Sequence, residues 1–171
     1  MSSSAFDAVA ETHRLTALLD PMIGHFERLL PLLEQERLAL KARNPEQLEI
    51  ATRRVEEVLV EIKRLDISRQ GMALRMAQSL GLKDDAVNLK ELDKAMGGNT
   101  GLLSYRQRLR DAIERAERSN RENQAIFKGV LVATETMLRA LKGSTQGQTT
   151  AYDRRGFRQS GPGYHFLSKQ F

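Results

Sequence analysis

The 171-residue sequence contains no cysteine and no long apolar run. Without cysteine the chain has no disulfide, no thiolate nucleophile and none of the thiolate ligands that hold most structural zinc ions. The longest apolar stretch, Val130 to Ala133, is a single helical turn, which is far too short to span a bilayer. Asp7 and Glu11 interrupt the N-terminal segment, so we expect no signal peptide, no membrane insertion and a cytoplasmic location.

Residues that could assemble a catalytic or metal site are also scarce. The three histidines match no i, i+4 ligand spacing: His13, His25 and His165. Two close glutamate pairs cannot share one helix face, Glu34 with Glu36 and Glu56 with Glu57. The glycine-rich run 97–101 lacks the consecutive Lys-Ser/Thr pair of a phosphate-binding loop and follows no predicted strand. We therefore expect no metal, no cofactor and no enzymatic activity.

Charge and aromatic residues are concentrated at the C-terminal end. Residues 143–171 carry four basic side chains and one acidic one, whereas residues 1–142 carry 23 basic and 21 acidic side chains. The body is thus nearly neutral, as is typical of the solvated faces of long helices. Five of the nine aromatic residues also lie in this tail: Tyr152, Phe157, Tyr164, Phe166 and Phe171. We expect a flexible tail whose aromatic rings contact another molecule.

The body has the apolar spacing of helices. Steps of three and four residues predict long helices at about 6–42, 45–80 and 102–142 and a short helix at 89–96. The fold class is therefore all-α, an elongated antiparallel bundle or coiled coil with one helical domain at 1–142 and a tail at 143–171. Two charged residues, Glu36 and Arg69, break the apolar rows. Pro21 and Pro31 predict a late start of the first helix near Pro21 or a bend at Pro31.

Capping residues predict how the first two helices are joined. Asn44 suits the N-cap of the second helix, Pro45 its first position, and Gln47 the third position of a capping box. Because this connection is so short, the two helices should lie antiparallel. Gly81 should end the second helix.

The last helix has two apolar halves separated by residues 117–124, which are polar on all sides. Such a segment weakens packing, so the second half could detach and turn its apolar face toward a partner. The alternative is that the helix packs along its whole length. The sequence leaves both open.

Three segments resemble the FlgN family of flagellar export chaperones. They are LEQERLALKARNPEQL at 33–48, NREN at 120–123 and YDRRG at 152–156. The likeness extends over nearly the whole chain in helix order and in the position of the tail. One departure is Gln124, where the family often has glycine after the second asparagine, which makes a local kink less expected.

The resemblance implies a cytoplasmic type III secretion chaperone that binds the hook-filament junction proteins FlgK and FlgL before export. It places substrate binding on the C-terminal part of the last helix, which maps here onto Asn120, Asn123, Ile126, Phe127, Val130, Leu131 and Leu138. It assigns docking to the export gate protein FlhA to the tail motif, which maps onto Tyr152 and Gly156.

Two other functions stay open at this point. A nucleic-acid-binding role would use the arginines and aromatic rings of the tail, combining phosphate contacts with base stacking. A structural coiled-coil subunit would form a stable homo-oligomer with its last helix sealed in the core. The chaperone hypothesis predicts that the protein has no nucleic-acid partner and leaves open whether it is a monomer or a homodimer.

Overall fold

The computed structural model describes residues 7–82 and 87–144, and these contain four helices and no strand. The helices are α1 (Ala8–Ala42), α2 (Pro45–Ser79), α3 (Leu89–Ala95) and α4 (Leu102–Ser144). Each helix begins and ends within two residues of its predicted position, and the all-α fold class is confirmed. Of the proposed tail at 143–171, the structure describes only residues 143 and 144, which end α4; the rest lies outside the described residues.

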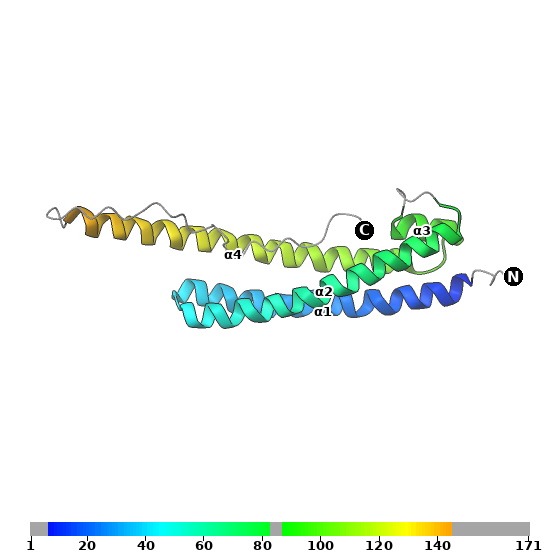
Figure 1. Ribbon diagram of the computed structural model, residues 1–171, viewed down its shortest axis with the longest axis horizontal. Helices are drawn as coiled ribbons and strands as arrows, with labels where there is room; N and C mark the ends of the chain where they lie inside the picture. The colour runs from blue at the N-terminus through cyan, green and yellow to red at the C-terminus, as the bar shows by residue number, and fades with distance from the viewer. Residues whose placement is uncertain (1–6, 83–86, 145–171) are drawn as a thin grey trace.

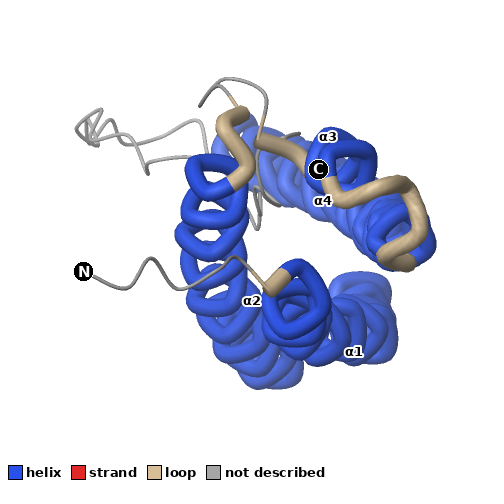
Figure 2. Tube along the Cα trace, turned by 90° about the vertical axis from the view of Figure 1, so that its right-hand side faces the viewer, coloured by secondary structure: helices blue, strands red, loops and turns tan. Residues whose placement is uncertain are grey.

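The helices form an elongated rod (Figure 1). α1 and α2 make an antiparallel hairpin, and α4 runs parallel to α1 and extends past the turn of the hairpin. α1 packs against both α2 and α4, while the short α3 packs against α4 and α2 at the other end (Figure 2). Because α1 contacts both other long helices, its position determines how far α4 is covered.

The predicted apolar rows form the core. Buried side chains come from all four helices and include Leu19, Phe26 and Leu33 of α1, Val55, Ile62 and Met76 of α2, Leu92 of α3, and Leu109 and Ala116 of α4. Burying a leucine, isoleucine, methionine or phenylalanine side chain contributes about 1.5–3 kcal/mol each. This burial holds the long helices side by side.

α1 corrects one expectation from the sequence. The helix starts at Ala8, where the Asp7 carboxylate accepts hydrogen bonds from the backbone N–H groups of Val9 and Ala10, both at 3.1 Å. The late start near Pro21 is therefore wrong, since the helix continues through Pro21 and Pro31. Both prolines are on the exposed side, so burial of the opposite face offsets the backbone hydrogen bonds they remove.

The turn between α1 and α2 forms as predicted. Arg43 takes a left-handed conformation with φ 51°, which lets the N–H of Asn44 bond to the carbonyl of Ala39 at 3.0 Å. The Asn44 side chain accepts a hydrogen bond from the N–H of Gln47 at 3.0 Å, and Pro45 is the first residue of α2. These contacts fix the reversal that makes the hairpin antiparallel.

α2 ends at the predicted glycine. Gly81 has φ +69°, and the N–H of Leu82 bonds to the carbonyl of Ala77 at 2.9 Å, as in a Schellman cap. Arg69, which breaks the apolar row of α2, is buried beside Asp66, with Nη2 and Oδ1 2.8 Å apart. Gln70 donates a further hydrogen bond to Asp66, so the buried carboxylate is paired on both oxygens.

Candidate protein-binding face on the last helix

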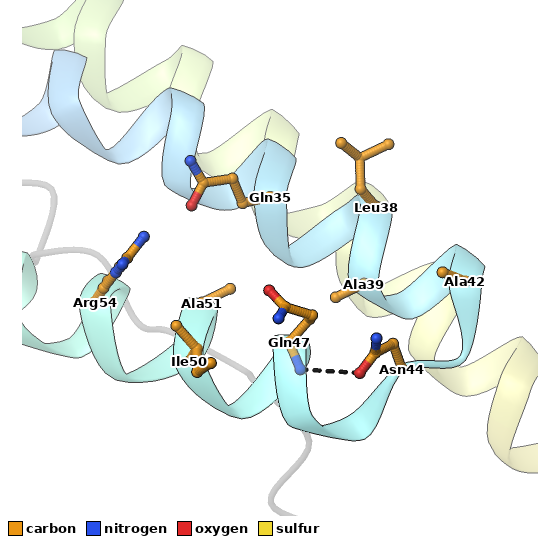
Figure 3. A pocket seen from close by; sticks show the side chains of 9 residues that line it. All are labelled: Gln35, Leu38, Ala39, Ala42, Asn44, Gln47, Ile50, Ala51 and Arg54. Carbon is orange, nitrogen blue, oxygen red and sulfur yellow. Dashed lines mark hydrogen bonds between the residues drawn. The ribbon is translucent and has the colours of Figure 1, made fainter.

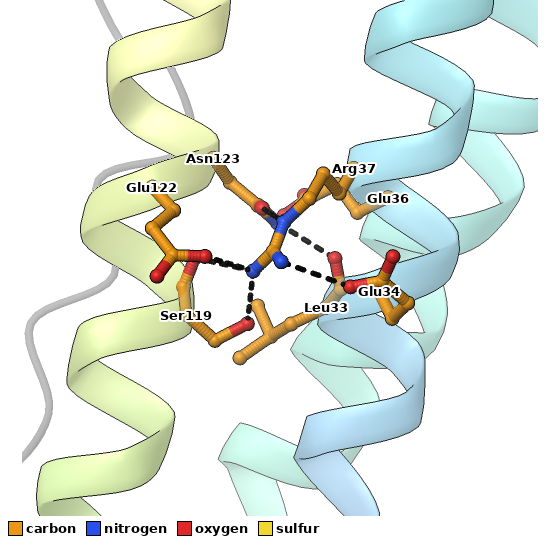
Figure 4. Close-up of polar contacts among 7 residues, drawn as sticks. All are labelled: Leu33, Glu34, Glu36, Arg37, Ser119, Glu122 and Asn123. Carbon is orange, nitrogen blue, oxygen red and sulfur yellow. Dashed lines mark hydrogen bonds and ion pairs between the residues drawn. The ribbon is translucent and has the colours of Figure 1, made fainter.

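A buried polar layer joins α4 to α1 near the hairpin turn (Figure 4). The side-chain amide of Asn123 donates to the carbonyl of Leu33 and to Oε2 of Glu36, both at 2.8 Å. Its oxygen accepts a hydrogen bond from Nε of Arg37 at 3.0 Å. The other oxygen of Glu36 accepts from the hydroxyl of Thr52 at 3.0 Å, which extends the layer to α2. Glu36, the exception in the apolar row of α1, therefore faces the core because its carboxylate has donors there.

Arg37 closes the same layer at its solvent edge. Its Nη2 lies 2.8 Å from the hydroxyl of Ser119 and 2.8 Å from a carboxylate oxygen of Glu122, both on α4. Its Nη1 pairs with Glu34 at 3.0 Å. A shift of α4 by one residue would separate these donors and acceptors, so the layer fixes the register of α4 against α1.

Beyond this layer α4 extends further than α1. Asn123 is level with Glu36, and at equal rise per residue α4 reaches the end of α1 near Val130. We call residues 130–144 the arm, which projects past the hairpin turn (Figure 1). Exposure rises along it, from half-buried Val130 to Leu131 at 38% and Leu138 at 52% exposed.

The apolar face of the arm continues the face that packs on α1. Steps of three and four residues run along one side of α4 through Ala116, Asn120, Asn123, Phe127, Val130, Thr134, Leu138 and Leu141. The first four are buried or half-buried, and the exposed end of the row includes Leu138 and Leu141. The hydroxyl of Thr134 donates to the carbonyl of Val130 at 2.9 Å, which satisfies the polar group in this row. The arm thus carries the continuation of the apolar row that packs in the core, but beyond the hairpin.

The structure sorts the predicted site residues by exposure. Asn120 and Asn123 are buried in the contact between α1 and α4. Ile126, Phe127 and Val130 are half-buried at the edge of the hairpin, and Leu131 and Leu138 are exposed on the arm. Tyr152 and Gly156, together with the basic aromatic tail of the nucleic-acid alternative, lie outside the described residues.

Several residues of this region were not predicted from the sequence. Met137 and Leu141 are exposed on the arm, and their apolar spacing was the available signal. Arg37 and Thr52 complete the polar layer, and they could not be predicted because their partners are remote along the chain. Of the two expectations for α4, neither describes the helix fully: it remains one continuous helix, packed at its start and projecting at its end.

A separate groove lies at the turn of the hairpin (Figure 3). Its floor is made of small side chains, Ala39, Ala42 and Ala51, and the exposed apolar side chains Leu38 and Ile50 lie at its rim. This groove is between α1 and α2, away from the arm. It offers a comparison surface for binding experiments.

The described residues show no arrangement suited to metal or membrane chemistry. In residues 7–82 and 87–144 no three histidine, aspartate or glutamate side chains gather where they could hold a metal ion. Within the same ranges no helix combines the length and apolar character needed to cross a membrane. The arm instead presents exposed apolar side chains, which are typical of protein-binding surfaces.

The family model described as "FlgN protein" matches residues 10–159, which is most of the chain. Neither a curated protein nor a solved structure matches the sequence.

Proposed function

The chain belongs to the FlgN family, whose members are flagellar export chaperones and not enzymes, and we propose from this premise that it is a cytoplasmic chaperone for the hook-filament junction proteins FlgK and FlgL. It holds these proteins before assembly and delivers them to the export gate protein FlhA. The observation that carries the proposal is the exposed apolar face of the arm, continuous with the core face of α4.

The arm suits an amphipathic helix of the cargo. In the bundle, α1 covers the apolar row of α4 up to the hairpin turn, so a cargo helix laid beyond the turn would cover the rest of the row. Leu131, Leu138 and Leu141 would then leave water, and each fully buried leucine contributes about 1.5–3 kcal/mol. Such a contact hides the assembly surface of the cargo without any chemical step.

The polar layer limits how far along α4 the proposed cargo contact extends. Asn123 and Glu36 already satisfy one another inside the bundle, so cargo binding beyond Val130 does not require these buried groups to separate. We therefore assign the cargo contact to Leu131 and Leu138 first, with Ile126, Phe127 and Val130 at its edge. Asn123 then acts by holding α4 in register, and Asn120 is buried about one turn before it.

Titration calorimetry with purified FlgK tests the site. We expect Leu131→Asp and Leu138→Asp each to weaken binding at least about tenfold, because a carboxylate would be buried against apolar cargo. Leu38→Asp, an exposed leucine on the rim of the hairpin groove, is the matched control and should bind normally. Normal binding by both arm variants, with helicity retained, would exclude the arm as the cargo site.

Gate docking is proposed for the tail, through Tyr152 with Gly156 behind it. Cutting the chain after Gly143 should leave the helicity and FlgK binding unchanged while abolishing binding to FlhA. Tyr152→Ala in the full chain should reproduce the loss. If the truncated chain still binds FlhA, docking must use the helical body instead.

A further inference from the structure

The outer face of α2 carries a row of exposed apolar side chains. Val60, Ile67 and Leu74 are 65%, 62% and 38% exposed and lie seven residues apart. They point away from the core row of the same helix, which includes Val55, Val58 and Ile62. A seven-residue repeat keeps apolar side chains on one seam along a helix, as in helices that pair with a second helix.

A glycine in the middle of this row is the second observation. Gly71 lies between Ile67 and Leu74 on the same face, inside α2. A methyl group added there would meet only Nη1 of Arg75, at 3.6 Å, so packing within the chain does not require glycine. Glycine inside a helix costs about 1 kcal/mol relative to alanine, and its use allows another backbone to approach closely.

We propose that this face pairs with the same face of a second copy of the chain, with the two α2 helices antiparallel and the two-fold axis at Ile67. In that arrangement residue i lies opposite residue 134 − i, so Ile67 meets its own equivalent and Val60 meets Leu74. Each copy thereby covers the other's apolar row. A two-fold interface requires such self-complementarity, and the even spacing of the three residues provides it.

The charges beside the row favour the antiparallel direction. Glu57 and Arg75 lie on the same flank of the apolar row, and within the described chain neither makes an ion pair. An antiparallel pairing about Ile67 brings Arg75 of one copy within two residues of the position opposite Glu57 of the other, twice per dimer. A parallel pairing would leave them about 27 Å apart along the helix axis.

Disulfide trapping tests both the pairing and its direction, because the natural chain has no cysteine. Under mild oxidation we expect Ile67→Cys alone to give a covalent dimer. Val60→Cys and Leu74→Cys should each stay uncrosslinked alone, since two-fold-related copies are about 20 Å apart, but should crosslink when mixed. Leu38→Cys, exposed on α1, is the control for random collision.

Sedimentation equilibrium supplies the measurement without a crosslink. The unmodified chain should dimerise, and Ile67→Glu should raise the dimer dissociation constant at least about tenfold, while Leu38→Glu leaves it unchanged. Efficient crosslinking of Val60→Cys with itself would overturn the antiparallel geometry. A chain that remains monomeric at all concentrations, or a dimer insensitive to Ile67→Glu, would overturn the interface itself.

Discussion

At the scale of single residues, Asn123 joins α4 to α1 about two turns before the arm begins. Replacing it with alanine removes the buried amide that donates to the carbonyl of Leu33 and to one oxygen of Glu36. We expect Asn123→Ala to lower the free energy of unfolding by about 1–3 kcal/mol, measured by urea denaturation.

Glu122→Ala is the matched control at the same level of α4. Glu122 pairs with Arg37 of the same layer but is exposed, so its loss should cost less than about 1 kcal/mol. Equal costs for the two variants would show that the buried layer does not hold α4.

Glu36 itself could be recognised in the sequence as an exception, but its partner Asn123, 87 positions away, could not.

At the scale of helices, the sequence predicted each element but not how far each is covered. Local signals placed the ends of α2, since Asn44, Pro45 and Gly81 act within their own turns. The late start predicted from the prolines of α1 was wrong because the backbone hydrogen bonds that they remove are a local loss. The burial that offsets this loss comes from contacts with other helices. The arm depends on the register between α1 and α4, which is set by contacts distant in sequence.

The arm has a glycine at its base. Gly129 is exposed on α4, and an added Cβ would meet no atom within 4 Å. Gly129→Ala should therefore stabilise the helix locally by about 1 kcal/mol without a clash. We expect amide hydrogen exchange of residues 130–141 to slow about fivefold.

Ala125→Gly, at a nearby exposed position, is the reverse control and should speed exchange in the arm by a similar factor. The amides of α1 and α2 should exchange unchanged in both variants. Equal protection in the glycine and alanine forms would mean that the arm does not open at its base.

At the scale of the whole molecule, the two surfaces proposed for binding, the arm and the outer face of α2, lie on different helices. The arm projects past the hairpin turn, and the α2 face lies along the side of the rod. An antiparallel α2 pairing would therefore point the two arms in opposite directions. Each arm would remain open to its own cargo.

This separation predicts that dimerisation and cargo binding are independent. Ile67→Glu should bind FlgK with unchanged affinity but form a one-to-one complex, whereas the unmodified chain forms a two-to-two complex, as judged by light scattering. Leu131→Asp should remain a dimer that binds FlgK weakly, because its substitution is remote from α2. A loss of FlgK affinity of about tenfold or more in Ile67→Glu would instead make the α2 face part of the cargo site.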